Sequence, residues 1–320
     1  MNENSTASTL RRHEKYDRLI AAAKSLQPIA TAVAHPCDET SLRGAVEAGE
    51  AGLIKPILVG PKDKIAAVAK QYSLNLGNIE IVDVPHSQAA AEKAVELVRT
   101  GKADLLMKGS LHTDELLSEV MKRETGLRTG RRVSHVFVMD VPGHAQTLFI
   151  TDAAVNIAPD LISKRDIIQN AIDLYAGLGL GIPKVAILSA VETVTPTIPS
   201  TIEAAALCKM ADRGQITGGE LDGPLAFDNA ISPEAARIKG IKSPVAGQAQ
   251  ILVVPDLEAG NMLAKNLTFL SHADAAGIVL GARVPIILTS RADHVRTRMA
   301  SCAVAALLRH SQMAKQPIGA

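Results

Sequence analysis

Short apolar runs alternate with longer segments of helical periodicity along most of the chain. The runs predict strands at 29–34, 56–60, 79–84, 104–107, 184–189, 251–254, 277–280 and 285–288. The segments between them predict helices at 15–26, 62–71, 87–100, 114–123, 161–178 and 201–213, with further helices ending near Gly52 and His310. Strands that alternate with helices in this way are typical of an α/β protein with a mainly parallel sheet.

Two β-rich runs break this rhythm in the middle of the chain. Residues 133–140 and 146–151 are joined by the turn-prone sequence Val141-Pro142-Gly143-His144. A connection this short predicts an antiparallel hairpin, which a parallel sheet can carry at its edge. The expected sheets are therefore parallel or mixed, and the hairpin indicates a domain boundary near residue 153. We expect the chain to return to the first domain at its end.

The stretch from Ser243 to Leu267 contains the strand around which a ligand site is expected. Its apolar run, Ile251–Val254, fits a strand that is buried on both faces. The run stops at Pro255-Asp256, and a helix is predicted to begin after Gly260-Asn261. Open α/β sheets bind ligands at the carboxyl ends of such strands, so Asp256 and Asn261 are candidate substrate-binding residues. Alternatively, both side chains cap their own turn, which is the commoner role for these residue types.

Composition and charge narrow the classes of partner. The 320 residues carry 34 Lys and Arg against 33 Asp and Glu, so no strong field attracts nucleic acid or an anionic membrane. With three Tyr, four Phe and no Trp, the chain has few side chains on which bases can stack. Hydrophobic residues make up 47% and the mean hydropathy is +0.14, so two α/β domains can each bury a core. We expect neither nucleic acid nor a membrane as a partner.

Cysteine usage and the N-terminal sequence indicate a cytoplasmic protein. Cys37, Cys208 and Cys302 lie far apart, and their odd number does not suggest a disulfide framework. Residues 1–18 are polar and lack the apolar core of a signal peptide, and no apolar run is long enough to span a bilayer. A soluble protein in a reducing compartment is therefore expected.

Neither a metal nor a nucleotide cofactor is expected. The histidines show no HxxxH or HExxH spacing, so a metal site is not predicted. Gly177, Gly179 and Gly181 follow a predicted helix rather than a strand, which is the wrong setting for a dinucleotide-binding loop. Three glycines placed like this are typical of a helix end.

Several motifs, read together, resemble one enzyme family. They are AVEAGEAGLIKPILVGP (45–61), DLLMKGSLHTDELL (104–117), ITDAAVNIAPD (150–160), GELDGPLAFDNAISPEAA (219–236), SPVAGQAQILVVPDLEAGN (243–261) and the turn Thr289-Ser290-Arg291. Their joint order resembles the phosphate acetyltransferase and phosphate butyryltransferase family, nearer the butyryltransferase-like branch. The resemblance implies reversible transfer of a short acyl group, acetyl or butyryl, between coenzyme A and inorganic phosphate, without a metal or a covalent enzyme intermediate.

The resemblance also implies a fold and an assembly. Two α/β domains of the isocitrate/isopropylmalate dehydrogenase type are expected, with a cleft between them. The second domain, 154–277, is inserted into the first, which comprises 1–153 and 278–320. The implied assembly is a homodimer that acts on acyl-CoA and phosphate, with coenzyme A as a substrate rather than a tightly bound cofactor.

By the same resemblance, the turn Thr289-Ser290-Arg291 carries the reaction. Arg291 would bind the phosphoryl group, because its planar fork takes two phosphate oxygens and stays charged. Ser290 would hydrogen-bond the reacting carbonyl group as it gains negative charge. Without the resemblance, this turn can equally be a helix N-cap followed by a surface arginine.

The sequence leaves open which group deprotonates the thiol of coenzyme A. In the acetyltransferases an aspartate follows the matching serine at the position that is Thr297 here. Asp293 is the nearest carboxylate and is the candidate catalytic base, with His294 as an alternative. Asp293 also suits the first turn of a helix, where the dipole favours a carboxylate.

The loop KGSLHT (108–113) follows a predicted strand and precedes a predicted helix. Lys108, Ser110 and Thr113 are candidate contacts to phosphate or coenzyme A, since the amides at a helix N-terminus can meet an anion. Alternatively, Thr113 is a simple cap with Asp114-Glu115 in the first turn. Where acetyltransferases carry an arginine farther along this helix, the chain has Ser118-Glu119, which favours the butyryltransferase-like branch.

Two other functions are compatible with the sequence. One is a metal- and NAD-dependent decarboxylating dehydrogenase-like oxidoreductase, which would need an aspartate cluster and a nucleotide loop. The other is a non-catalytic coenzyme A-binding module, because Thr297 replaces the family aspartate.

Overall fold

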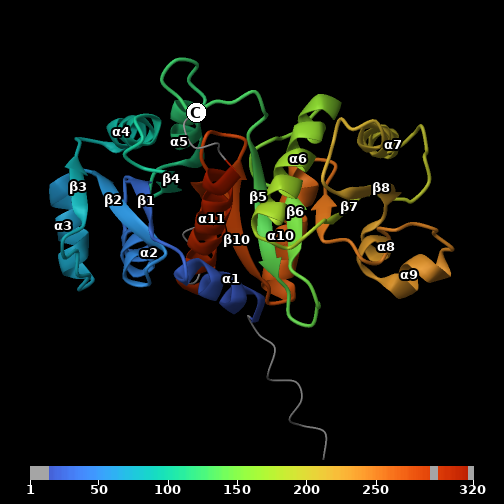
Figure 1. The fold of residues 1–320 in the computed structure, drawn as a ribbon, viewed down its shortest axis with the longest axis horizontal. Helices are drawn as coiled ribbons and strands as arrows, with labels where there is room; N and C mark the ends of the chain where they lie inside the picture. The colour runs from blue at the N-terminus through green and yellow to red at the C-terminus, as the bar shows by residue number, and fades with distance from the viewer. Residues whose placement is uncertain (1–13, 289–294, 316–320) are drawn as a thin grey trace, which may run out of the picture. The chain divides into compact units, whose positions relative to one another are not determined.

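The computed structural model describes residues 14–288 and 295–315, which form two compact units (Figure 1). The first, named the β1 unit here, consists of residues 19–133 and the described part of 276–320. The second, the β9 unit, consists of residues 14–18 and 134–275. The predicted domain boundaries at 154 and 277 differ from the limits of these units and stay a prediction. No helix in the described ranges is both long and apolar enough to cross a bilayer.

In the β1 unit the strand order is β3-β2-β1-β4-β11-β10. Its strands are β1 (Ile29–Ala34), β2 (Ile54–Gly60), β3 (Glu80–Asp83), β4 (Leu105–Lys108), β10 (Asp274–Leu280) and β11 (Ile286–Ile287). The helices are α2 (Glu39–Glu50), α3 (Lys62–Gln71), α4 (Ser87–Arg99), α5 (Thr113–Val120) and α11 (Val295–Lys315). Only β10 and β11 pair antiparallel within this order, and the predicted βαβ rhythm is confirmed.

In the β9 unit the strand order is β5-β6-β9-β7-β8. Its strands are β5 (Ser134–Asp140), β6 (Leu148–Thr151), β7 (Lys184–Leu188), β8 (Glu220–Leu225) and β9 (Ile251–Val253). The helices are α6 (Leu161–Gly177), α7 (Pro199–Asp212), α8 (Phe227–Ile231), α9 (Pro233–Ile238) and α10 (Leu257–Leu270). The predicted hairpin is confirmed as the antiparallel pair β5 and β6, whereas β6, β9, β7 and β8 pair in parallel.

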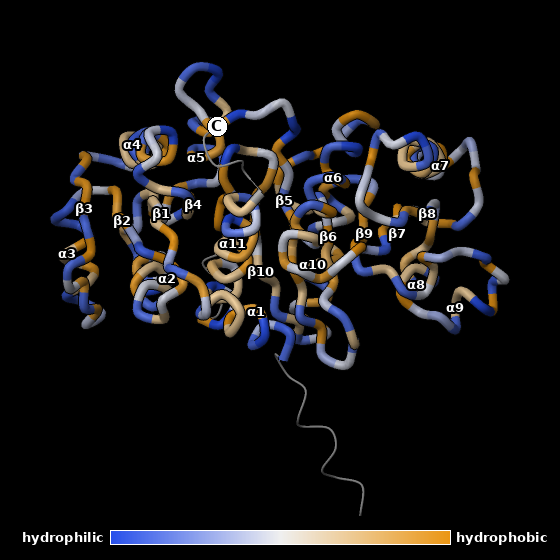
Figure 2. Tube along the Cα trace, in the orientation of Figure 1, coloured by the Kyte–Doolittle hydropathy of each residue, from blue (hydrophilic) through white to orange (hydrophobic). Residues whose placement is uncertain are grey.

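Strand β9 is buried on both faces, as its apolar run predicts. Ile251, Leu252 and Val253 are each no more than 1% exposed, and β6 and β7 flank them. Leu252 belongs to a cluster of buried aliphatic side chains that forms the core of the unit. In the β1 unit, strand β2 is likewise largely hydrophobic (Figure 2). Ligand-binding groups are expected at the carboxyl end of a buried strand such as β9.

The helix that follows β9 begins earlier than predicted. Asp256 is the N-cap of α10, and its carboxylate accepts a hydrogen bond from the backbone N–H of Ala259 at 2.8 Å. The predicted start after Gly260-Asn261 is therefore wrong, because both residues lie inside the helix. Gly260 is needed there for close packing rather than for a turn: an added Cβ would lie 2.9 Å from the carbonyl oxygen of Asp152.

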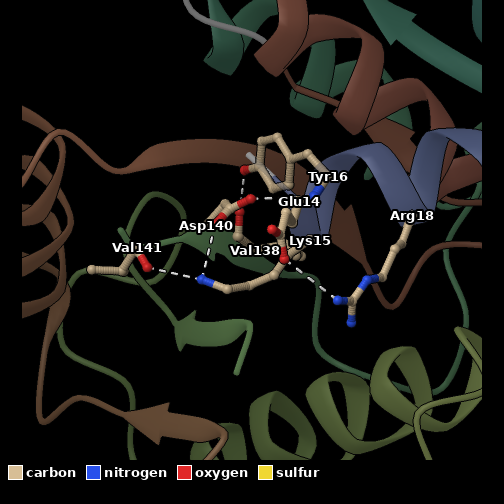
Figure 3. A network of polar contacts seen from close by, with 7 residues as sticks. All are labelled: Glu14, Lys15, Tyr16, Arg18, Val138, Asp140 and Val141. Atoms are coloured by element: carbon tan, nitrogen blue, oxygen red, sulfur yellow. Dashed lines mark hydrogen bonds and ion pairs between the residues drawn. The ribbon is translucent and has the colours of Figure 1, made fainter. Parts of the chain in front are cut away.

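Residues 14–18, the first turns of α1 (Glu14–Lys24), are joined to β5 by a buried carboxylate (Figure 3). The side chain of Asp140 is 2% exposed, and its Oδ1 lies 2.9 Å from Nζ of Lys15. Its Oδ2 accepts a hydrogen bond from the backbone N–H of Tyr16 at 3.2 Å. The Tyr16 hydroxyl donates to the carbonyl oxygen of Val138 at 2.5 Å. These bonds fix the start of the described chain to a strand that lies 124 residues away in the sequence.

Candidate functional site

The loop after β4 lies tightly against the end of β1. The backbone N–H of Gly109 donates to the carbonyl oxygen of Ala34, and that of Ser110 donates to His35, both at 2.9 Å. A Cβ at Gly109 would lie 2.2 Å from the Ala34 carbonyl oxygen, a distance that no side chain permits. Glycine at this position therefore allows two neighbouring parallel strands to bring their loops together.

His35 and Ser110 form the centre of this site in the β1 unit. His35 has a φ of 54°, in the left-handed region where His, Asn and Asp are enriched among non-glycine residues. Its Nδ1 lies 2.9 Å from Oγ of Ser110, whose hydroxyl donates to the His35 carbonyl oxygen at 2.8 Å. The hydroxyl has one proton, so it donates either to the carbonyl oxygen or to Nδ1. In the first case Nδ1 carries a proton and donates it to Oγ, and the neutral ring has its lone pair on Nε2.

The Ser110 hydroxyl holds this arrangement rather than offering itself to a ligand. Its Oγ also accepts a hydrogen bond from the backbone N–H of Cys37 at 3.3 Å. Together with the bonds to His35, this joins the hydroxyl to the loop after β1. The contact between Ser110 and substrate, which the sequence predicts, has no support in these bonds and stays a prediction.

The electrostatic surroundings keep the site neutral. Burial lowers the pKa of His35, and the positive charge of Lys64 lowers it further, whereas Glu115 and Asp38 raise it. Burial also raises the pKa of the Cys37 thiol to about 11, against a smaller opposing effect of Lys64. At neutral pH the imidazole is therefore uncharged and able to accept a proton, and the thiol is protonated.

The other two residues predicted in this loop, Lys108 and Thr113, lie beside the same strand end. Lys108 ends β4, and its Nζ donates to the carbonyl oxygen of Gly109 at 3.1 Å. Thr113 is the first residue of α5, whose N-cap is His112 without a side-chain hydrogen bond. The alternative in which Thr113 caps the helix is therefore wrong. Contacts of Lys108 and Thr113 with a substrate stay a prediction.

Glu119, which stands where the resemblance places an arginine, is buried in α5 and has structural partners. Its Oε2 lies 2.6 Å from Nζ of Lys122, and its Oε1 accepts a hydrogen bond from the side chain of Gln88. Lys122, just after the end of α5, matches the charge of this carboxylate, and the hydrogen bond from Gln88 joins α5 to α4. Glu119 offers no positive charge to a phosphate.

In the β9 unit, the polar residues at the carboxyl ends of β6 and β9 also have structural partners. Asp256 caps α10, as the capping alternative predicts. The side-chain amide of Asn261 donates to the carbonyl oxygen of Ala153 at 3.3 Å. Both residues thus hold α10 and the loop after β6 in place, and their contact with a substrate stays a prediction.

Asp152 and His135 are polar residues of this unit that the sequence does not single out. The buried carboxylate of Asp152 accepts backbone hydrogen bonds from Ala154 and Val155, each at 3.0 Å. His135 is buried beside it, and burial lowers its pKa to about 4 although the charge of Asp152 opposes the shift. The only signal for Asp152 is its place after an apolar run, in the motif ITDAAVNIAPD.

Ser290, Arg291 and Asp293, the predicted catalytic residues, lie outside the described residues, as does the alternative base His294. Thr297, at the position of the family aspartate, is described and lies in α11. Its side chain is buried, and its carbonyl oxygen accepts a hydrogen bond from the Ser301 hydroxyl at 3.0 Å. A buried threonine cannot accept the proton of a thiol, so this position supplies no base. Among the described residues, no group of His, Cys, Asp and Glu side chains is arranged to hold a metal ion.

Residues 86–306 match the model of a known family, described as phosphate acetyl/butaryl transferase. The chain belongs to this family. The matched range includes the loop after β4, the β5–β6 hairpin and the turn with Ser290 and Arg291. All the motifs on which the resemblance was based lie in this range, except AVEAGEAGLIKPILVGP.

Individual relatives agree with the family assignment. A phosphate acetyltransferase of Rhizobium meliloti is 76% identical over 94% of this chain and 96% of its own length. A phosphate butyryltransferase of Clostridium acetobutylicum is 43% identical over 92% of this chain and 98% of its own. The higher identity to a relative named acetyltransferase does not favour the expected place nearer the butyryltransferase-like branch.

A solved structure agrees with the fold. A branched-chain phosphotransacylase from Enterococcus faecalis V583 is 31% identical and superposes with a TM-score of 0.76, covering 88% of this chain and 99% of that chain. The α/β architecture with a mixed sheet is therefore shared with a phosphotransacylase.

Proposed function

We propose that the protein is a phosphate acyltransferase, which transfers a short acyl group reversibly between coenzyme A and inorganic phosphate. The observation that carries this proposal is the 76% identity to a phosphate acetyltransferase over 94% of the chain. Coenzyme A is a substrate in this reaction and leaves after each turnover.

The preferred acyl group is acetyl. Identity to the acetyltransferase of Rhizobium meliloti is 76%, against 43% to the butyryltransferase of Clostridium acetobutylicum. Each added methylene changes selectivity by about 1–3 kcal/mol in an apolar pocket, so two methylenes are enough to separate acetyl from butyryl.

In the proposed mechanism, Arg291 holds the phosphoryl group through two parallel hydrogen bonds and offsets its negative charge. Ser290 donates a hydrogen bond to the carbonyl oxygen as the tetrahedral species gains charge. The sequence offers Asp293 as a candidate base within this turn, to be tested against other groups of the site, and Lys108 and Thr113 are candidate contacts for the phosphates of coenzyme A. The acyl group passes directly between sulfur and phosphate oxygen, without a covalent enzyme intermediate.

The test is release of free thiol from acetyl-CoA by the purified protein, with and without inorganic phosphate. We expect thiol release only with phosphate, and kcat/KM for acetyl-CoA at least about tenfold above that for butyryl-CoA. Sulfate at equal ionic strength serves as the control anion. A folded preparation without phosphate-dependent thiol release from either thioester would contradict the proposal. Reduction of NAD by a hydroxy acid would indicate the oxidoreductase. Binding of coenzyme A without turnover would indicate the non-catalytic binding module.

We also propose a fold type for the two units. The two α/β units correspond to the two domains of an isocitrate/isopropylmalate dehydrogenase-like fold. The support is that from residue 19 onward the chain forms the β1 unit, then the β9 unit, and returns to the β1 unit near residue 276, as expected for an inserted domain; residues 14–18 belong to the β9 unit. The cleft implied by the resemblance stays a prediction, and the proposed location of the enzyme is the cytoplasm.

The proposed assembly is a homodimer formed through α10. Met262, Phe269 and Leu270 on this helix are 65%, 71% and 73% exposed, and large apolar side chains grouped on one helix are typical of a protein interface. An equally exposed isoleucine outside α10, Ile238 on α9, provides a matched control.

Replacing Phe269 with glutamate is expected to raise the dimer dissociation constant by about tenfold or more, because a carboxylate would be buried in an apolar contact. Light scattering after size-exclusion chromatography at several concentrations measures the change. Ile238→Glu should leave the dimer intact. A dimer that survives Phe269→Glu unchanged would exclude α10 as the interface.

A further inference from the structure

We propose that His35 is the catalytic base of this enzyme, accepting the thiol proton of coenzyme A on Nε2, with Ser110 as the residue that orients the ring. The inference rests on the proposed acyltransferase function and deepens it. Acyl transfer to phosphate needs a group that removes the thiol proton in one direction and returns it in the other. Thr297, at the position of the family aspartate, is a buried threonine and cannot be that group.

The first argument is the geometry of the ring. A catalytic imidazole needs one nitrogen fixed by a hydrogen bond so that the other points its lone pair at the substrate. Nδ1 of His35 lies 2.9 Å from Ser110 Oγ, and Ser110 is itself held by the His35 carbonyl oxygen and the Cys37 N–H. This contact fixes the ring, and in the tautomer that the proposal assigns, Nδ1 carries the proton and Nε2 the lone pair.

The second argument is the place of His35 in the fold. It directly follows β1, whose last residue Ala34 pairs with Lys108 at the end of β4. The carboxyl ends of adjacent parallel strands are where α/β proteins bind their ligands. The site therefore combines an oriented imidazole, the amino group of Lys108 and the N-terminal end of α5, which has no side-chain cap.

The third argument is the conformation of His35. The φ of 54° is costly for most residues, and such strain is found where the surroundings fix a side chain for a function. The backbone N–H of His35 donates to the carbonyl oxygen of Val59 at 2.7 Å, which holds the residue from the side of β2. The ring is thus placed by β1, β2 and β4 together.

The proton balance of the step is complete without another reactant. In the direction of acyl-CoA synthesis, Nε2 takes the S–H proton while sulfur forms its bond to the carbonyl carbon of the acyl phosphate. The bond from that carbon to the phosphate oxygen breaks, and the oxygen leaves with the electron pair. The imidazolium then gives its proton to the departing phosphate, which leaves as the monohydrogen dianion and restores neutral His35. In the reverse direction, the imidazolium protonates the departing thiolate.

The groups that face His35 predict how activity depends on pH. Burial and Lys64 lower the pKa of the ring, and Glu115 and Asp38 raise it. The neutral form exists above this pKa, so the rate of acyl-CoA synthesis should fall as the pH drops below it. Removing the Lys64 charge should raise the pKa and move the fall to higher pH, and removing the Glu115 charge should move it to lower pH.

The main experiment is His35→Asn, since asparagine tolerates positive φ and keeps an amide that can donate to Ser110. With acetyl phosphate and coenzyme A as substrates, kcat should fall by about 100-fold or more, while KM for coenzyme A changes by less than about threefold. The acid limb of the kcat/KM profile should disappear. Ser110→Ala should lower kcat less and retain that limb, because the base is present but poorly oriented.

A second pair of variants separates catalysis from a structural role. Lys64→Met and Glu115→Gln should shift the acid limb of the active enzyme in opposite directions, which a purely structural histidine would not cause. Circular dichroism and thermal unfolding check that each variant folds. The role of His35 would be overturned if folded His35→Asn kept kcat within threefold of the wild type. It would also be overturned if the acid limb were lost in Asp293→Asn instead. A wild-type protein without phosphate-dependent turnover would instead contradict the proposed function itself.

Discussion

Replacing Arg291 with alanine is expected to lower kcat/KM for acetyl-CoA and phosphate by about a thousandfold while leaving the fold intact. The reaction brings a phosphate dianion against a thioester or thiolate, so the transition state concentrates negative charge. A guanidinium offsets that charge with two parallel hydrogen bonds, and loss of one such group typically costs about 10²–10³ in rate. Rates at varied phosphate concentration, with thermal unfolding in parallel, measure the effect.

Two further variants make the test of Arg291 specific. Arg291→Lys keeps the charge but loses the planar fork, so its rate should lie between those of the wild type and the alanine variant. Arg283→Ala removes an exposed arginine that lies eight residues earlier in the chain and should leave kcat/KM within about twofold. If Arg291→Ala retained near-normal activity, Arg291 would be removed from the mechanism.

Replacing Gly109 with alanine is expected to lower the free energy of unfolding by about 3 kcal/mol or more. The new Cβ would lie 2.2 Å from the Ala34 carbonyl oxygen and 2.5 Å from that of His35, so backbone atoms of β1 would have to move. Because the same movement separates Ser110 from His35, activity should fall as well. Urea unfolding of both proteins measures the first effect, and the acetyl-CoA assay measures the second.

Gly130 provides the control for this substitution. A Cβ there meets nothing within 4 Å, so Gly130→Ala should change the free energy of unfolding by less than about 0.5 kcal/mol. Equal stability of Gly109→Ala and Gly130→Ala would show that the loop after β4 can shift, and the close contact with β1 would lose its proposed importance.

The regular elements could be predicted from the sequence where a local pattern determines them. The run Ile251–Val254 is apolar at every position, and the hairpin is marked by a Pro-Gly turn. Strand β8 and helices α8 and α9 could not be predicted in this way. Both helices are short, and long-range bonds hold α8: the carbonyl oxygen of Asn229 accepts from Gly247 N–H at 2.8 Å, and that of Ala230 accepts from Ala249 N–H at 3.1 Å. Isolated helices of this length are unstable, so their stability comes from tertiary contacts.

In the candidate site, too, only the residues marked by a local sequence pattern could be predicted. Ser110 is predicted because its loop lies between a strand and a helix, a local pattern. Its partner His35 lies 75 residues away, and no periodicity connects the two. The one available signal was that both follow buried strands, since residues after neighbouring parallel strands meet at one edge of a sheet. Asp256 was predicted at a strand end for a similar reason, although its hydrogen bond is that of a helix cap.

The raised thiol pKa values of the three cysteines have a practical consequence for measuring turnover. Burial raises the pKa of Cys37 to about 11, and those of Cys208 and Cys302 to about 12. Colorimetric disulfide reagents react with thiolates, so at neutral pH the thiols of the native enzyme react slowly with them. Free coenzyme A, with an ordinary thiol pKa in water, reacts fast. A continuous colour assay can therefore count product molecules in the presence of the enzyme without first blocking its cysteines.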